Sequence, residues 1–425
     1  MATLASAAAS DLHDGLARVP ARDLTVPPLP RVSVQAFCEG AALAGQLQAA
    51  AADRRMARVH FRLQMGGLAA AEEAYRDAPT PNVIVVESPA TREALFEGLD
   101  RLSNYCDADT RVVVIGRLND ITLYRDLIRR GISDYLIEPV ETLDIIAALS
   151  GLFTVPDARP LGRTLAVLGA KGGVGASTVA HNLAFAIARD FALDAVIADL
   201  DLPFGTAGLD FNQDPPQGTA DAVLAPERVD AAFIDRLLSK CAERLSLLAA
   251  PATLERTYDL TAESFEPLFD TLRNTAPMIV LDVPHLWTTW ARHAVLGADE
   301  VVIVAAPDLA NLRNAKNLFD LVRAARPNDR PPRYVLNQVG VPKRPEIRAA
   351  DFAKALGAEP LAAIPFDAAL FGTAANNGQM VAEVNGTHKA TEAFRFIAQT
   401  ITGRVEAKRP ARSVIGPLFA KLRKR

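Results

Sequence analysis

A glycine-rich loop between a predicted strand and a predicted helix constrains the fold of this chain more than any other feature. Residues 164–169 (TLAVLG) form a short apolar run, which is typical of a buried parallel strand. After the loop, apolar residues recur every four positions from Val179 to Phe191, which predicts a helix. The N-terminus of such a helix presents unpaired backbone N–H groups. The arrangement therefore favours an α/β fold with a phosphate site over a merely tight turn between strand and helix.

The loop lacks the lysine that usually closes a phosphate-binding loop. Its glycines keep side chains away, so that backbone N–H groups can surround the phosphates, and Ser177 is expected to hold Mg²⁺. A lysine usually precedes this serine and reaches the β- and γ-phosphates, but Ala176 occupies that position, and a different lysine, Lys171, opens the loop. We therefore expect unusual treatment of the γ-phosphate. The loop residues predicted to bind nucleotide are Lys171, Gly172, Gly173, Val174, Gly175, Ala176, Ser177 and Thr178.

Two further apolar strands are predicted to end in carboxylates. The run 195–199 ends in Asp199, and Asp201 follows two positions later, so both side chains point the same way. The run 278–282 ends in Asp282, which has the form of a Walker B aspartate that holds Mg²⁺ through water. Either run alone is compatible with an ordinary strand that ends in a solvated acid. Together with the loop, they predict a Mg²⁺–nucleotide site at the carboxyl ends of the strands.

These motifs give residues 164–400 a resemblance to the MinD/ParA family of deviant Walker A ATPases. The resemblance implies that Lys171 is the signature lysine, which crosses a dimer interface to the partner's phosphates. It implies that Asp201 orients the attacking water with Asp199 beside it, and that Asp282 is linked to Mg²⁺ together with Ser177 and Asp199. ATP and Mg²⁺ are the cofactors that follow from it, and a homodimer that forms with ATP is the expected assembly.

The late part of the same segment carries weaker signals for the adenine base. The resemblance places Asn337 beside the base, although a simple turn residue at a strand end is an alternative, and it places Pro365 and Phe366 at the flank of the base. Two tryptophans, Trp287 and Trp290, follow Asp282. We expect them to be core aromatics that anchor a helix, in preference to a partner contact.

The replacement at Ala176 points to one branch of the family. Residues 169–178, 199–211 and 307–316 resemble the CpaE/TadZ pilus-assembly proteins. This resemblance implies a protein that localises Flp/Tad-type pilus assembly and secretion machinery, at a cell pole or at the inner membrane. Proteins of the pilus or of type II-like secretion machinery are then its partners. Without the loop lysine, charge on the phosphates is less well neutralised, so we expect slow ATP hydrolysis.

An N-terminal α/β domain is expected over residues 31–150. Residues 81–140 resemble a response-regulator receiver, but Glu87 stands at the phospho-acceptor aspartate, Glu138 at the lysine and Gly116 at the Thr/Ser position. Without a nucleophile or charge neutralisation, phosphoryl transfer is not expected. The domain is therefore interpreted as a pseudo-receiver with a flavodoxin-like fold, used for docking or for dimerisation.

Composition and charge bound the rest of the chain. It has 425 residues, of which 50% are apolar and 23% charged, and its three scattered cysteines form no C-x-x-C pair, as in a cytoplasmic protein. We expect a flexible leader over 1–30, a linker over 151–163, the ATPase domain over 164–403 and a basic tail over 404–425. The tail holds eight Lys or Arg residues and one Glu, a net charge of +7, and since the chain carries −4 the remainder carries −11.

The uneven distribution of charge between the tail and the remainder of the chain indicates which partners to expect. The tail is compatible with weak contact to an anionic membrane, or with a solubilising or protein-docking segment. A ParA-like DNA-partitioning ATPase is the main alternative function, but it needs a basic face for DNA, and the acidic remainder of the chain disfavours specific nucleic-acid binding.

Overall fold

The computed structural model describes residues 26–154 and 160–404, and these two ranges form two separate compact units. Most of the predicted leader, the middle of the predicted linker and all of the predicted tail except Arg404 lie outside the described residues. The end of the predicted leader is packed: Leu29 is buried in the core of the first unit, and its N–H donates to the carbonyl of Arg55.

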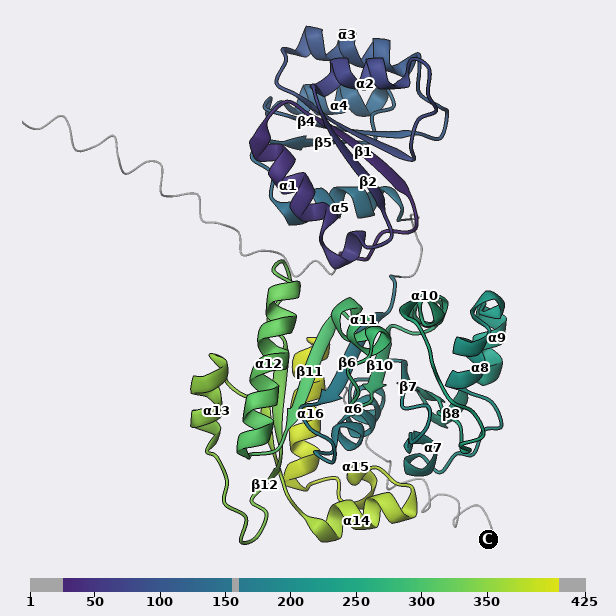
Figure 1. Cartoon of the computed structure of the whole chain (residues 1–425), viewed down its shortest axis with the longest axis vertical. Coiled ribbons are helices and arrows are strands. Elements are labelled where there is room, and N and C mark those ends of the chain that lie inside the picture. Colours follow the sequence, from purple (N-terminus) through teal and green to yellow (C-terminus); the bar gives the residue numbers. More distant parts are fainter. Residues whose placement is uncertain (1–25, 155–159, 405–425) are drawn as a thin grey trace, which may run out of the picture. The chain divides into compact units, whose positions relative to one another are not determined.

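The first unit is a five-stranded parallel sheet with helices on both faces (Figure 1). The strand order β2-β1-β3-β4-β5 is the flavodoxin-like order. Its elements are β1 (Ser33–Cys38), α1 (Ala41–Ala51), η1 (Arg54–Met56), β2 (His60–Met65), α2 (Gly67–Tyr75), β3 (Val83–Ser88), α3 (Arg92–Ser103), β4 (Arg111–Gly116), α4 (Ile121–Arg129), β5 (Asp134–Ile137) and α5 (Thr142–Leu152).

Two apolar clusters fill the first unit, one on each face of the sheet. One cluster lies between the sheet and helices α1 and α5, and the other lies between the sheet and helices α2, α3 and α4. The central strand β3 is buried along its whole length, as expected for a strand covered on both faces. The predicted α/β class is confirmed for this unit, and its interpretation as a pseudo-receiver stays a prediction.

The second unit is built on an eight-stranded sheet in the order β13-β12-β11-β6-β10-β7-β9-β8, parallel except for the β8–β9 pair. Its strands are β6 (Arg163–Gly169), β7 (Ala195–Asp199), β8 (Ser239–Ala242), β9 (Leu245–Leu248), β10 (Met278–Val283), β11 (Glu300–Ala305), β12 (Arg333–Val339) and β13 (Ala362–Pro365). Its helices are α6 (Ala176–Asp190), α7 (Ala207–Asp210), α8 (Thr219–Leu224), η2 (Pro226–Arg228), α9 (Ala231–Leu237), η3 (Ala262–Ser264), α10 (Glu266–Thr275), α11 (Thr289–Gly297), α12 (Leu309–Ala325), α13 (Ala349–Leu356), α14 (Ala368–Asn377), α15 (Val381–Val384) and α16 (Lys389–Thr402).

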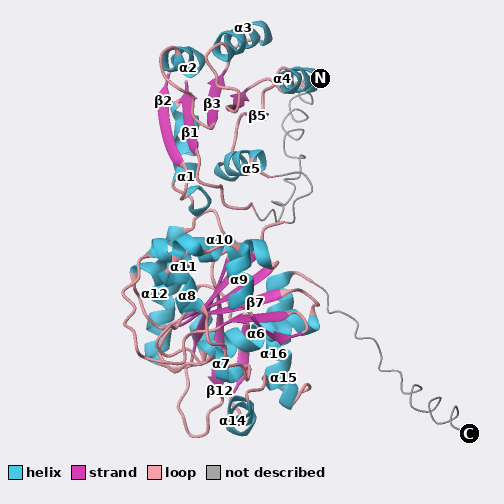
Figure 2. Ribbon diagram, turned by 90° about the vertical axis from the view of Figure 1, so that its right-hand side faces the viewer, coloured by secondary structure: helices cyan, strands magenta, loops and turns pink. Residues whose placement is uncertain are grey.

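Helices also cover both faces of this sheet (Figure 2). Helices α6 and α16 pack together over one face, while helices α10 to α13 contribute to the cluster on the other. The three predicted motif strands are neighbours, since β10 pairs with both β6 and β7, and Asp282 lies opposite Asp199 in register. The predicted α/β fold with a mostly parallel sheet is confirmed, and it brings the predicted site residues to one edge. Within residues 26–154 and 160–404, no helix is both long and apolar enough to cross a bilayer.

Candidate functional site

The glycine loop joins the end of β6 to the start of α6. Gly173 and Gly175 have φ angles of +77° and +81°, a region that favours glycine, and Gly175 is the N-cap of the helix. A Cβ atom on Gly175 would also lie 2.6 Å from the side-chain nitrogen of Asn337. Position 175 therefore requires glycine for two reasons, the backbone conformation there and the close approach of β12.

Side chains from three other segments hold the carbonyl groups of this loop. The contacts, with N···O distances, are His285 Nδ1 to Gly169 O (2.9 Å), Asn314 Nδ2 to Ala170 O (2.9 Å), Gln338 Nε2 to Gly173 O (3.0 Å) and Asn337 Nδ2 to Val174 O (2.8 Å). Because the carbonyls are bonded from outside, the loop is braced while backbone N–H groups at the helix N-terminus can serve an anion.

Asn337 is one of these loop contacts, and its predicted place beside the adenine base stays a prediction. Its side chain is buried, and its amide nitrogen is used on the loop, so the structure makes it a loop brace first. Phe366 is partly exposed just after β13, and its N–H donates to the carbonyl of Val339. The predicted base contacts of Pro365 and Phe366 stay predictions.

The loop region is poor in positive charge where a phosphate would sit. Ala176 is the first residue of α6 and packs against the apolar cluster beneath the helix, while Ser177 and Thr178 follow it half-buried. Lys171 is exposed. Partial burial favours the neutral form of Asp308, but hydrogen bonds from Asn311 and the charge of Lys171 outweigh it and lower the pKa of Asp308. Lys171 therefore lies in electrostatic reach of the N-terminus of α12.

Asp199 braces the turn after β7. Its Oδ1 accepts the N–H of Asp201 and its Oδ2 accepts the N–H of Ala207, both at 3.1 Å, and the residue has no exposed surface. A Cβ on Gly205 would come 2.3 Å from Asp199 Oδ2, so this turn closes tightly on the carboxylate. Burial and the neighbouring charge of Asp282 raise the pKa of Asp199. The structure shows this bracing role for Asp199, and its predicted part in holding Mg²⁺ stays a prediction.

Asp201 is the more accessible of the two carboxylates. It is half-buried, and its Oδ1 accepts the N–H of Phe204 at 3.2 Å. Burial, with a smaller contribution from Asp282, raises the pKa of Asp201. A partly exposed acid at the carboxyl end of β7 is compatible with the predicted water-orienting role.

A buried histidine that sequence reasoning missed lies behind Asp282. His181, in the second turn of α6, has no exposed surface, and its Nδ1 lies 2.7 Å from Asp210 Oδ2. Its Nε2 lies 3.2 Å from Asp282 Oδ2, an ion-pair contact without the alignment of a hydrogen bond. Burial disfavours the imidazolium, but the two carboxylates outweigh it and raise the pKa of His181 to about 10.

The residues present fit a magnesium ion better than a tightly caged metal. In the described part of the chain, no group of three or more His, Cys, Asp or Glu side chains is arranged to hold a metal ion. Mg²⁺ commonly takes only one or two protein ligands and completes its shell with waters and phosphate oxygens. Ser177 in the first turn of α6 and Asp282 at the end of β10 are the residues that would hold it, and the ion would neutralise phosphate charge.

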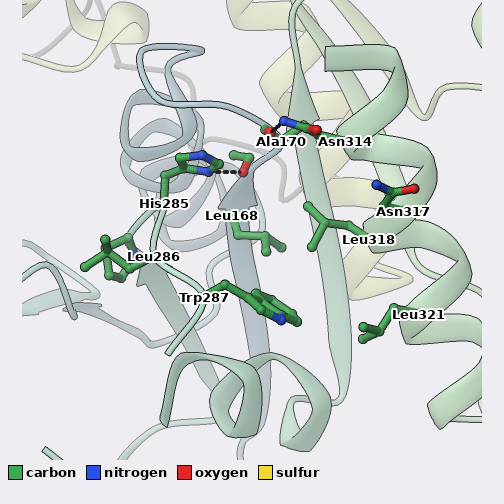
Figure 3. Close-up of a pocket in the computed structure, with 11 residues that line it drawn as sticks. Leu168, Ala170, His285, Leu286, Trp287, Asn314, Asn317, Leu318 and Leu321 are labelled. Carbon is green, nitrogen blue, oxygen red and sulfur yellow. Dashed lines mark hydrogen bonds between the residues drawn. The ribbon is translucent and has the colours of Figure 1, made fainter. Parts of the chain in front are cut away.

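An apolar pocket adjoins the loop on the side of α12. It has a volume of about 320 Å³, and His285 and Asn314, which brace the loop, are in its wall. Figure 3 shows the Trp287 ring across the pocket from Leu318 and Leu321 of α12. Trp287 is 48% exposed, so its predicted core role is wrong, whereas Trp290 is buried and stacks on Phe265 at a centroid distance of 4.5 Å.

The corresponding strand ends of the first unit are occupied by structural contacts. The buried Glu87 carboxylate accepts the N–H groups of Glu39 and Gly40 at 2.7 and 2.8 Å. Glu138 pairs with Arg117 at 3.1 Å. A Cβ on Gly116 would lie 2.7 Å from the hydroxyl of Tyr135, so the side chain of a Thr or Ser there would collide with that ring.

Sequence comparison finds MinD proteins. The chain is 32% identical to the septum site-determining protein MinD of Synechocystis sp., over 39% of this chain and 60% of that protein. It is 29% identical to a MinD protein of Mesostigma viride, over 57% of this chain and 85% of that protein. The first match therefore spans less than two thirds of its relative. No protein-family model matches the chain.

Solved structures with a similar fold include ParA and MinD proteins. A ParA family ATPase from Chlorobium tepidum is 24% identical, with a TM-score of 0.51, over 56% of this chain and 98% of that one. MinD from Pyrococcus horikoshii, solved with Mg-ADP, is 20% identical, with a TM-score of 0.50, over 57% and 96%. The pilus assembly protein CpaE of Caulobacter crescentus is 42% identical, with a TM-score of 0.30, over 30% and 98%. The chain belongs to the MinD/ParA family of ATPases, and its sequence is similar to CpaE pilus assembly proteins.

Proposed function

We propose that this protein binds Mg²⁺–ATP, dimerises when ATP is bound, and hydrolyses the ATP slowly. Its function is then the formation of an assembly and not the production of ADP and phosphate. The observation that carries the proposal is the loop at the start of α6. Neighbouring side chains brace its carbonyl groups, and Ala176 stands where the usual lysine would be. The loop geometry supports phosphate binding, while the missing charge supports weak binding by a single protomer and slow turnover.

The missing charge is restored by a second protomer in this proposal. Lys171 is exposed at the opening of the loop, whereas Asp199 and Asp282 at the neighbouring strand ends are buried acids that supply no positive charge to a triphosphate. A lysine contributed across a dimer interface would supply a charge-assisted contact to phosphate, worth about 1.5–3 kcal/mol. Since that contact exists only in the dimer, ATP binding and dimerisation become coupled.

The place of action follows from the likeness to CpaE proteins. We propose that the dimer localises Flp/Tad-type pilus assembly and secretion machinery, at a cell pole or at the inner membrane, and that proteins of this machinery are its partners. The first unit, whose Glu87 is already bonded to two backbone N–H groups, would dock or dimerise without being phosphorylated. The predicted weak membrane contact of residues 404–425 belongs to the same proposal.

Equilibrium binding of ATP with Mg²⁺ by calorimetry tests the first step. Wild-type protein is expected to bind ATP more tightly at high than at low protein concentration, because the dimer completes the site. Ser177→Ala should remove most of the Mg²⁺ dependence, while Thr402→Ala, at the end of α16, should not. Absence of ATP binding at any protein concentration would contradict the proposal. Salt-sensitive binding of random duplex DNA in ATP would favour the DNA-partitioning alternative.

A further inference from the structure

The buried histidine on α6 connects the two segments that carry Ser177 and Asp282 with helix α7. His181 lies one turn after Ser177 on the same helix. One ring nitrogen contacts Asp282 at the end of β10, and the other contacts Asp210, the last residue of α7. Asp210 and the histidine are 29 residues apart in sequence, so the contact depends on the folded unit.

The surroundings of the ring leave it little freedom. His181 has no exposed surface, and the ring of Phe211 packs against it at a centroid distance of 5.6 Å. The short 2.7 Å contact with Asp210 fixes the rotation of the imidazole, because the other nitrogen is then directed at Asp282. Asp282 is itself 3% exposed, so water has little access to its carboxylate and cannot easily replace the imidazole as its partner.

We propose that His181 is a positioning residue of the magnesium site, which holds the Asp282 carboxylate in the orientation that Mg²⁺ and its bound water require. The inference rests on the proposed Mg²⁺–ATP function and deepens it. Through Asp210, the same ring links Asp282 to helix α7, which follows β7 and Asp201 in the chain. The arrangement is a carboxylate–imidazole–carboxylate chain in which the outer groups orient Asp282, the carboxylate on the side of the metal.

Such outer partners have a measurable effect on metal affinity. Substitution of a group that orients a metal ligand typically weakens metal affinity by about 10–100-fold. A residue with a purely structural role would instead weaken nucleotide binding with and without Mg²⁺ alike. The ratio between the two affinities therefore separates positioning from general stability.

The experiment titrates Mg²⁺ into the full chain with a fluorescent ADP analogue and compares two substitutions of the histidine. His181→Asn places an amide near the Nδ1 position, so it keeps a partner for Asp210 and loses the Asp282 contact. His181→Gln places an amide near the Nε2 position and keeps the Asp282 contact. We expect His181→Asn to raise the half-saturating Mg²⁺ concentration about 10–100-fold, His181→Gln to restore most of the loss, and neither to change binding in EDTA.

The control is the neighbouring buried residue on the same helix. Asn182 donates to the carbonyl of Thr178 and accepts the N–H of Val381, so both ends of its amide are used away from Asp282. Asn182→Ala should therefore leave the Mg²⁺ midpoint unchanged. If His181→Asn does not fold, Asp210→Ala, at a partly exposed position, releases the ring from the other side and should shift the midpoint in the same direction by a smaller factor, because the contact between the imidazole and Asp282 is kept.

Three results would overturn the inference. The first is an unchanged Mg²⁺ midpoint in a folded His181→Asn or Asp210→Ala protein, when wild-type binding depends on Mg²⁺. The second is an equal loss of binding with Mg²⁺ and with EDTA. The third is wild-type protein that binds no nucleotide under either condition, which removes the proposed function and this inference with it.

Discussion

Restoring the missing lysine is the most informative single change, because its effect on ATP affinity can be estimated in advance. Ala176→Lys places a cation at the first position of α6, where the usual loop lysine reaches the phosphates. A charge-assisted contact of this kind contributes about 1.5–3 kcal/mol. The positive end of the helix dipole opposes a cation there by about 0.3–1 kcal/mol. The net gain of about 0.5–2.7 kcal/mol corresponds to about 2–100-fold tighter ATP binding.

The assay is ATP binding at a protein concentration low enough to keep the protein monomeric. Ala176→Met is the matched control, since it adds a side chain of similar length without the charge. We expect Ala176→Lys to bind ATP more tightly than the wild type and Ala176→Met to bind it no more tightly. The ATP affinity of Ala176→Lys should also depend less on protein concentration. Equal ATP affinities for the wild type and Ala176→Lys would refute the assignment of this position.

Three other changes follow from single contacts. Asn337→Ala leaves the Val174 carbonyl without its side-chain donor, so we expect a loss of about 1–3 kcal/mol in unfolding free energy and equal weakening of ATP and GTP binding. A loss of ATP affinity without a loss of GTP affinity would instead support the predicted adenine contact. Glu87→Ala leaves two backbone N–H groups unpaired and should lower the unfolding free energy by about 2–3 kcal/mol. Because Glu87 stands at the phospho-acceptor position, acetyl phosphate should not label the wild-type protein. Asp299→Ala removes the carboxylate paired with the buried Arg273 at 2.8 Å, and chemical denaturation should show a loss of about 3–5 kcal/mol. A loss below about 1 kcal/mol would contradict the buried-charge argument.

The parts of the fold that sequence predicts well are those with a local signal. Strands β6, β7 and β10 are short apolar runs, so their places in the sequence, and the aspartates at the ends of β7 and β10, follow from the residues themselves. Strand β2 gave no such signal. It lies at the edge of its sheet and holds only two core-facing residues, Phe61 and Leu63, which are half-buried between exposed polar residues.

The parts of the site that sequence misses are contacts between distant segments. The spacing of Asp282 predicts its place at a strand end, but nothing in the order of residues shows that His181 lies against it. The bonds from His285 and Asn314 to the loop are likewise set by how β10 and α12 pack beside β6. Asn337 was predicted from its position after a strand, and only the packed structure shows that its amide is used on the loop.

Light scattering with ADP, ATP and a nonhydrolysable ATP analogue tests the central claim most directly, because the claim is that a second protomer completes the charge of the triphosphate site. The account predicts that wild-type protein is a monomer with ADP and a dimer with the analogue, and that Lys171→Ala stays a monomer with both. A wild-type monomer that binds ATP firmly and does not dimerise, or a Lys171→Ala protein that dimerises as the wild type does, would contradict it.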